Sequence, residues 1–423
     1  MKIFIAEEIP SLNKGEAAIL YGMIESFRVL QPAEVSLLSF SAETDKKAYK
    51  NLKIIDASDN LNLSNDFQKN KKSKLFQSFL VFIRYLYAIL LYKLKFSFKS
   101  EGSIWKEYFE TDIIIIGHDG TFSGFFGSIP FLHVYNLLIA KSFKKHIVIY
   151  GGSIELQNKF QNIIARYILK RVDLITLRDE NSFQHYNDLN VNNNNVFLTA
   201  DLAFLLNPIP LSDAKELLIN EGISFKKPLI GMTVTKEIFN SCFPEIKNID
   251  IKYEKSISLF SELIDYMVES FDVSIIFLPH CIGPGKDLDD RIVSKDVYDM
   301  VKNKDKVYLI ENEYSPDQLK GMMGHMELFI GQRLHSVIGS LSMKIPSIAI
   351  LHAFNRNKIL SDVLDEKWVI KTYNLEFEMI KNSIDDLWAN RMEVKKVLES
   401  NIPKVINRSK QNSTLIKKIY EGS

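Results

Sequence analysis

The sequence contains little of what disulfide-bonded or metal-binding proteins require. Its 423 residues include two cysteines, Cys242 and Cys281, which are too few for a disulfide framework and do not form a CxxC pair. The eight histidines show neither HxxxH nor HExxH spacing, the arrangements that place two zinc ligands on one helix face. We therefore expect no metal site. The low cysteine content is typical of a protein in a reducing compartment.

The sequence also lacks an excess of charge of either sign. Its 53 basic and 52 acidic residues leave a formal net charge of +1, which argues against nucleic acid as the main partner. Hydrophobic residues make up 46% and charged residues 25% of the chain. These shares are those of an ordinary globular protein and exclude a fibrous or disordered one.

Long uncharged hydrophobic runs are missing as well. Residues 75–98 are apolar on nearly every helical face, but Arg84 and Lys93 leave only 85–92 uncharged between them, whereas a membrane span needs roughly 20 residues. This favours a buried helix pair. The alternative is peripheral contact of residues 69–98 with anionic lipid headgroups at the inner face of the membrane. The apolar run at 2–6 is too short for a signal peptide, so we expect a cytoplasmic protein.

The length and the spacing of apolar runs predict two domains. Short buried strands alternate with helical segments throughout, which is the pattern of doubly wound parallel sheets. We expect an α/β fold with two Rossmann-like domains facing a cleft, at 1–206 and 207–375, followed by helices over 376–423. The strands are predicted at 2–6, 35–40, 112–117, 146–150, 173–177, 196–198, 229–234, 273–278, 307–310, 328–330, 347–351 and 368–370.

The stretch 327–352 carries the clearest chemical signal. An apolar strand at 328–330 is followed by a charged turn and a helix rich in small residues at 336–343. Arg333 and His335 therefore lie at the carboxyl end of a strand and the amino end of a helix, the edge where open α/β sheets bind ligands and where helix N–H groups favour an anion. Arginine adds a two-pronged donor and histidine a proton carrier. The alternative is a surface ion pair and a plain helix cap.

The same stretch resembles a known family. Gly331-Gln332-Arg333-Leu334-His335-Ser336, followed by Ile345-Pro346-Ser347-Ile348-Ala349-Ile350, is similar to the most recognisable block of the polysaccharide pyruvyl transferases. Weaker resemblances lie at 13–20, at Arg178-Asp179-Glu180-Asn181-Ser182, at Asp201 with Phe204, and at His280 with the downstream Asp287. One departure is Gly117-His118-Asp119-Gly120, where the family often has a run of glycines, so acceptor contacts are expected to differ there.

The resemblance implies a GT-B-like fold whose final helix crosses back to the first domain. It also implies transfer of the enolpyruvyl group of phosphoenolpyruvate to a saccharide acceptor, free or lipid-linked, as a cyclic ketal, with no cofactor. The residues predicted to bind phosphoenolpyruvate are Arg333, Leu334, Arg178, Ser336 and His280. His335 is the predicted acid and Asp119 a weaker candidate base. The predicted acceptor-binding residues are Asn13, Lys14, Gly15 and His118.

Two other functions fit the same edge. A GT-B glycosyltransferase would bind the diphosphate of a nucleotide sugar there, and a non-catalytic module would bind a saccharide or nucleotide without turnover. The retention of Arg333, His335 and Arg178 argues against the module.

Overall fold

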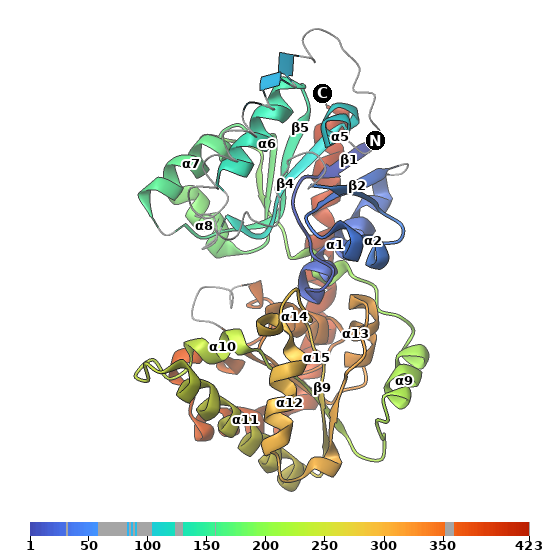
Figure 1. Ribbon diagram of the computed structural model, residues 1–423, viewed down its shortest axis with the longest axis vertical. Coiled ribbons are helices and arrows are strands. Elements are labelled where there is room, and N and C mark those ends of the chain that lie inside the picture. The colour runs from blue at the N-terminus through green and yellow to red at the C-terminus, as the bar shows by residue number, and fades with distance from the viewer. Residues whose placement is uncertain are drawn as a thin grey trace. The chain divides into compact units, whose positions relative to one another are not determined.

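The computed structural model describes residues 1–30, 33–57, 83, 86–87, 89–90, 104–122, 130–156, 158–351 and 359–422. By their contacts the residues form two compact units (Figure 1). Unit 1 comprises Met1–Ser11, Ile24–Asp201 and Lys410–Ser423, and unit 2 comprises Leu12–Met23 and Leu202–Ser409. The sequence predicted the division between 206 and 207, whereas the contacts divide the chain between Asp201 and Leu202. In addition, the start of one helix belongs to unit 2 and the end of another belongs to unit 1.

Unit 1 contains a parallel sheet in the strand order β3-β2-β1-β4-β5-β6-β7. Its central strands are apolar on both faces because helices cover both sides, and residues 113–116 of β4 are completely buried. The strands are β1 (Lys2–Ile5), β2 (Glu34–Ser39), β3 (Lys53–Asp56), β4 (Ile113–Phe122), β5 (His146–Ile154), β6 (Leu174–Leu177) and β7 (Val196–Leu198). The described helices are α1 (Lys14–Phe27, whose first turns belong to unit 2), α2 (Ala42–Ala48), α5 (Ile104–Glu110), α6 (Pro130–Ser142), α7 (Lys159–Leu169) and α8 (Glu180–Asp188).

Unit 2 contains a second parallel sheet in the order β10-β9-β8-β11-β12-β13. Its strands are β8 (Leu229–Thr233), β9 (Ser274–Phe277), β10 (Val307–Leu309), β11 (Leu328–Gly331), β12 (Ser347–Leu351) and β13 (Val369–Lys371). Its helices are α9 (Leu211–Asn220), α10 (Lys236–Ser241), α11 (Ile249–Phe271), α12 (Asp290–Met300), α13 (Pro316–Met323), α14 (Leu334–Ser342) and α15 (Phe377–Glu421), the last of which ends in unit 1.

Both sheets reverse their strand order next to a central strand. The chain fills one side of β1 with β2 and β3 before β4 pairs with the other side, and it does the same around β8 with β9 and β10 before β11. The strand ends at such a reversal diverge and leave room for a ligand. The expected α/β fold with two doubly wound sheets is confirmed, and the two switch points lie between β1 and β4 and between β8 and β11.

Two local features differ from the expectation. The sequence analysis missed β3, whose four residues Lys53–Asp56 include only two apolar ones. The segment expected to be a loop after Gly117 belongs to β4 as far as Phe122, because it continues to pair with β5 through register shifts.

The membrane question concerns residues 69–98, which lie outside the described residues except at 83, 86–87 and 89–90. Among the helices that the structure describes, none has both the length and the apolar character that crossing a bilayer requires.

Candidate active site at the strand ends of unit 2

The candidate site begins at the switch point between β8 and β11. Gly331 ends β11, and a Cβ there would lie 2.4 Å from a side-chain atom of α14, so the close start of the helix requires glycine. Gln332 joins the two strand ends, because its N–H donates to Thr233 Oγ1 (3.0 Å) and its Oε1 accepts the N–H of Thr235 (2.8 Å). Arg333 is thereby fixed at the amino end of α14.

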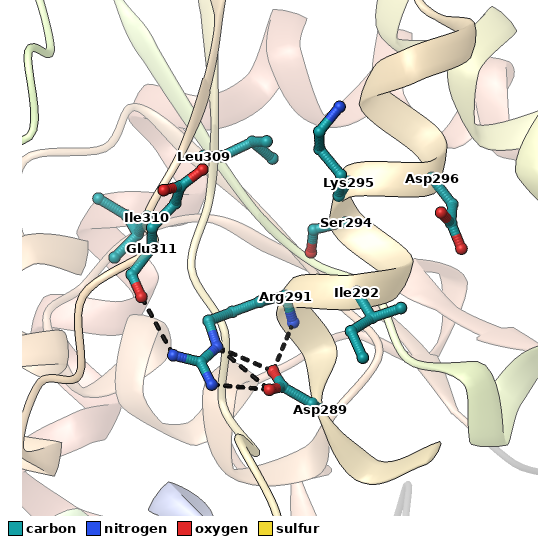
Figure 2. Close-up of a pocket in the computed structure, with 9 residues that line it drawn as sticks. All are labelled: Asp289, Arg291, Ile292, Ser294, Lys295, Asp296, Leu309, Ile310 and Glu311. Atoms are coloured by element: carbon teal, nitrogen blue, oxygen red, sulfur yellow. Dashed lines mark hydrogen bonds and ion pairs between the residues drawn. The ribbon is translucent and has the colours of Figure 1, made fainter. Parts of the chain in front are cut away.

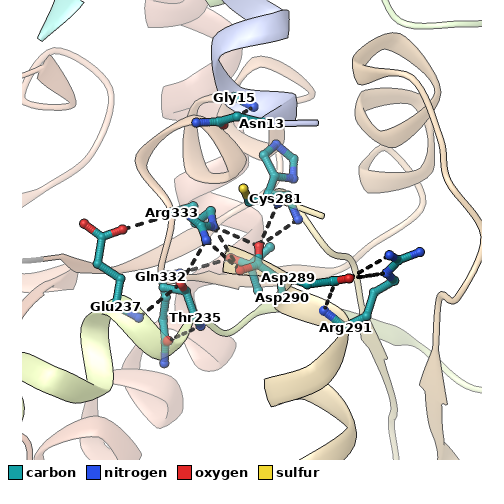
Figure 3. Close-up of polar contacts among 12 residues, drawn as sticks. Asn13, Gly15, Thr235, Glu237, Cys281, Asp289, Asp290, Arg291, Gln332 and Arg333 are labelled. Atoms are coloured by element: carbon teal, nitrogen blue, oxygen red, sulfur yellow. Dashed lines mark hydrogen bonds and ion pairs between the residues drawn. The ribbon is translucent and has the colours of Figure 1, made fainter. Parts of the chain in front are cut away.

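Arg333 pairs with the buried Asp290 on one side and with the exposed Glu237 on the other (Figure 3). Its Nε donates to Asp290 Oδ2 (2.8 Å), and its Nη2 donates to Asp290 Oδ1 (2.7 Å) and to Thr235 Oγ1 (3.0 Å). Its Nη1 lies 3.7 Å from Oε2 of Glu237, whose side chain is 60% exposed. Burial works to lower the pKa of Arg333, but the Asp290 carboxylate outweighs it and raises the pKa. The guanidinium therefore stays charged, with one nitrogen facing a solvent-exposed carboxylate.

Asp290, the acid that aligns the guanidinium, was missed by the sequence analysis. It is buried at the first position of α12 and accepts the backbone N–H groups of His280 (3.0 Å) and Cys281 (2.8 Å). The sequence resemblance pointed instead to Asp287 in the same loop, but Asp287 is exposed and pairs with Lys236. The available signal was an acid at a helix start directly after the Pro-His loop.

The amino end of α1 forms another side of the site. Asn13 Oδ1 accepts the N–H of Gly15 (3.2 Å) and caps the helix, and the N–H of Lys14 donates to the carbonyl of His280 (2.8 Å). Gly15 lies so close to His335 that an added Cβ would be 2.8 Å from its Nδ1. From the sequence, Asn13, Lys14 and Gly15 are predicted to bind the acceptor. They lie in unit 2, beside His280, which is predicted to bind the donor, and His335, the predicted acid.

Lys14 adds a second cation with the same kind of partner as Arg333. Its side chain is buried, and its Nζ lies 2.7 Å from Oε1 of Glu313, whose side chain is 52% exposed. Lys14 and Arg333 thus each pair with a carboxylate that remains largely in water. Because the carboxylate of each pair is exposed and stays hydrated when it is released, an incoming anion can replace it at the buried cation.

His280 is an uncharged polar group within this basic cluster. Burial, together with the neighbouring His335, Arg333 and Lys14, lowers the pKa of His280 to about 3. Within the part of the chain that the structure describes, its buried Nδ1 has no hydrogen-bond partner. An orphaned buried nitrogen is unfavourable in the free protein, so a bound ligand that reaches this atom would relieve the cost.

Ser336 and Leu334 lie inside the fold around Arg333. Ser336 is completely buried, and its hydroxyl donates to the carbonyl of Arg333 (2.7 Å) and lies 2.9 Å from Thr233 Oγ1. Leu334 is buried as well. These contacts suit the positioning of the turn, and a direct contact of either side chain with substrate stays a prediction.

Arg178 lies in unit 1, within a buried network at the ends of β5 and β6. It forms an ion pair with Asp119, donates through Nη1 to Asp201 Oδ2 (2.6 Å) and donates through Nε to Ser153 Oγ (2.7 Å). Burial works to lower the pKa of Arg178, and the acids around it raise it overall. This environment is that of a structural ion-pair network. Donor binding by Arg178 and base catalysis by Asp119 stay predictions.

His118 lies at the other switch point, between β1 and β4. Its Nδ1 is 2.6 Å from Oε2 of Glu7, which follows β1, and both side chains are buried. A carboxylate in this position holds the imidazole in one orientation. The predicted acceptor contact of His118 is compatible with this place at a strand-end edge, and it stays a prediction.

A pocket of about 440 Å³ lies beside α12 and β10 (Figure 2). Its lining mixes charges of both signs, and Arg291 within it is already bound to Asp289 (Nη2 to Oδ2, 2.7 Å) and to the carbonyl of Glu311 (3.1 Å). It includes none of the residues predicted from the sequence. We therefore place the candidate site at the switch point and not in this pocket.

A comparison with models of protein families shows which family the chain belongs to. The model of a family described as polysaccharide pyruvyl transferase matches residues 13–353. The chain belongs to this family. The resemblance seen in the sequence is confirmed, and the protein is a transferase of polysaccharide biosynthesis.

A curated relative of this chain is the amylovoran biosynthesis protein AmsJ of Erwinia amylovora. The two are 26% identical over 363 residues, which is 83% of each chain. Solved structures show the same fold at lower identity. A glycosyltransferase from Rickettsia africae is 12% identical, with a TM-score of 0.59 over 100% of this chain and 98% of its own. A UDP-GlcNAc 2-epimerase from Neisseria meningitidis is 13% identical, with a TM-score of 0.60 over 99% of each chain. The fold is therefore GT-B-like.

The site residues predicted from the sequence fall into two groups. Those in unit 2 surround the β8–β11 switch point or the adjoining start of α1: Arg333, Leu334, His335, Ser336, His280, Asn13, Lys14 and Gly15. Those in unit 1 are Arg178, Asp119 and His118.

Proposed function

We propose that the protein transfers the enolpyruvyl group of phosphoenolpyruvate to a pair of sugar hydroxyls and closes it as a pyruvate ketal. The observation that carries the proposal is the basic cluster at the β8–β11 switch point, where Arg333 and Lys14 each pair with an exposed carboxylate. Phosphoenolpyruvate has a phosphate and a carboxylate, so two separated cations and a helix amino end match its charge.

Each group then has a role in binding the donor. Arg333 Nη1 exchanges Glu237 for one anionic group of the donor, and Lys14 exchanges Glu313 for the other. The ring of neutral His280, in the tautomer with the hydrogen on Nδ1, donates a hydrogen bond to an oxygen of phosphoenolpyruvate. In this arrangement Lys14 and Gly15 belong to the donor site, although their place in the sequence suggested the acceptor.

His335 is the proposed acid. A proton added to the methylene carbon of phosphoenolpyruvate makes a methyl group and an oxocarbenium-like centre at C2. One sugar oxygen bonds to C2, the C2–O bond to phosphate breaks, and the second sugar oxygen closes the ring. Of the two hydroxyl protons released, one replaces the proton taken from His335 and the other leaves with phosphate or buffer. An anionic donor beside His335 favours its protonated form.

Turnover with phosphoenolpyruvate and a panel of saccharides tests the proposal. We expect phosphate release that depends on the acceptor, together with a new methyl signal on the saccharide by NMR. His335→Ala should lose turnover and keep donor binding, whereas Arg333→Ala should lose both. Release of a nucleoside diphosphate from a nucleotide sugar would instead support the glycosyltransferase alternative. Equal activity of wild type and both variants would disprove the site.

A further inference from the structure

Helix α7 of unit 1 exposes three large apolar side chains on one face. Phe160 is 59% exposed, Ile163 is 65% exposed and Tyr167 is 39% exposed. Their spacing of three and then four residues places them in one stripe along the helix. Scattered apolar residues are normal on a protein surface, but an aligned stripe on one helix is a candidate docking surface.

Basic residues flank this stripe. Lys159, Arg166 and Lys170 are exposed and share one side of the helix because they are separated by seven and four residues. Arg171 follows the helix, and its guanidinium lies 3.9 Å from the centre of the Tyr167 ring. The sequence from 156 to 172 contains no aspartate or glutamate. The described residues of α7 and the two that follow it therefore contribute apolar side chains and positive charges, but no negative charge, to the exposed face.

The opposite face fixes the helix in the unit. Asn158 caps α7 by accepting the N–H of Gln161 (3.0 Å), and Ala165, Ile168 and Leu169 are buried in the core. The helix also packs against α6 (Figure 1). The apolar stripe thus lies on a helix whose opposite face is packed into the core of unit 1.

We propose that this face of α7, residues 159–171, docks on an anionic lipid bilayer. Apolar and aromatic side chains that enter the interface, with lysines and arginines at headgroup level, are the pattern of interfacial helices. Charge argues for this occupant over a second copy of the chain, because two such faces in a symmetric contact would bring like charges together. The proposal does not depend on the donor chemistry, and the face lies apart in sequence from residues 69–98.

Binding of the full chain to lipid vesicles tests the proposal. We expect the protein to sediment with vesicles of phosphatidylcholine mixed with phosphatidylglycerol, and not with phosphatidylcholine alone. Binding should weaken at about 0.5 M salt, where charges are screened within a few ångströms. Lys159→Gln/Lys170→Gln should lower the partition coefficient on the order of 30-fold, since each basic residue near an anionic surface contributes about 1 kcal/mol. Phe160→Ser/Ile163→Ser should lower it by roughly tenfold or more.

Matched variants elsewhere separate this face from general effects. Ile219→Ser changes an exposed apolar residue of α9, and Lys395→Gln/Lys396→Gln removes two exposed charges from α15. Both should bind vesicles like the wild type, and the melting temperatures of all variants should confirm folding. Absence of binding to anionic vesicles, or equal binding by the α7 variants and the wild type, would overturn the proposal. A change in oligomeric state of Phe160→Ser/Ile163→Ser without a change in lipid binding would assign the face to self-association and overturn it as well.

Discussion

The Arg333 side chain is oriented before any ligand arrives. Asp290 binds two of its nitrogens, and the backbone N–H groups of His280 and Cys281 hold Asp290 in turn. A buried ion pair of this kind adds little net stability, but the loss of one partner leaves an uncompensated charge. We therefore interpret the role of Asp290 in this pair as holding the Arg333 guanidinium in a fixed orientation.

Replacing Asp290 with asparagine tests this function of the pair. Asp290→Asn should lower the free energy of unfolding by about 3 kcal/mol, because it leaves the largely buried Arg333 without its carboxylate. It should also raise the dissociation constant for phosphoenolpyruvate, because Arg333 loses its orientation. Chemical denaturation and calorimetric titration measure the two effects. Asp287→Asn, at the exposed acid of the same loop, is the control and should change neither quantity.

At this scale the sequence predicted the positions of Arg333 and His335 better than it predicted the residues that hold them in place. The positions of Arg333 and His335 followed from one strand–turn–helix pattern within a short stretch. Asp290 could not be found in this way, because it precedes Arg333 by 43 residues and its contact depends on how the β9 and β11 strand ends lie. Arg178 resembled a family motif, but the sequence did not reveal that Asp119 and Asp201, which it singled out separately, both contact Arg178.

At the scale of elements, the clearest unexpected contact is that between the start of α1 and His335. The sequence order groups this helix with the first domain, yet Leu12–Met23 belongs to unit 2, and Gly15 lies against His335. A glycine at this position allows two helix starts, those of α1 and α14, to lie close to the same histidine.

A methyl group at position 15 should disturb both catalysis and the packing of the two helix starts. In Gly15→Ala the added Cβ would lie 2.8 Å from Nδ1 and 2.9 Å from Cβ of His335, so the whole residue must shift and not only its ring. We expect a fall in kcat of tenfold or more and a lower melting temperature, because this overpacking outweighs the higher helix propensity of alanine. Gly285→Ala is the control, because a Cβ there meets no atom within 4 Å. Equal rates for the two variants would show that the position of His335 does not depend on Gly15.

Helix α13 carries a buried lysine that links it to the preceding chain. Lys320 is 4% exposed, and its Nζ donates to the carbonyl of Leu206 (2.6 Å). Burial lowers the pKa of Lys320 to about 7. Below pH 7 both folded and unfolded states carry the charge, and the full cost of burying it is present. Above pH 7 the folded state loses the proton first, so this group makes stability rise with pH up to its unfolded pKa.

Replacing Lys320 with methionine should remove this pH dependence. Lys320→Met should be more stable relative to the wild type at pH 6 than at pH 9, because the wild type is relieved of its buried charge as pH rises. The loss of the hydrogen bond to Leu206 lowers the stability of the variant equally at both values. Denaturant unfolding across this range measures the difference, and a constant difference would show that Lys320 keeps the same charge in both states.

The elements themselves were largely predictable. Strands such as β4 and β11 are continuous apolar runs that only a strand buried on both faces explains. The short β3 was missed because Lys53-Ile54-Ile55-Asp56 has too few apolar residues to stand out. The extension of β4 through Asp119 depends on pairing with β5 and has no local signal.

At the scale of the whole molecule, fold and family give different kinds of information. The solved structures share the GT-B-like fold at 12–13% identity, and they include a glycosyltransferase and an epimerase, so the fold alone does not select a reaction. The family selects a transferase of polysaccharide biosynthesis. The proposal that phosphoenolpyruvate is the donor rests in addition on the basic cluster of unit 2.

Donor binding by the intact protein is the most direct test of that claim. Calorimetric titration of the wild type, Arg333→Ala and His335→Ala with phosphoenolpyruvate and with a UDP-sugar compares the two candidate donors on one site. The account predicts that phosphoenolpyruvate binds the wild type and His335→Ala, that Arg333→Ala loses this binding, and that the UDP-sugar does not compete. Binding of the UDP-sugar alone, or binding of phosphoenolpyruvate that Arg333→Ala leaves unchanged, would contradict it.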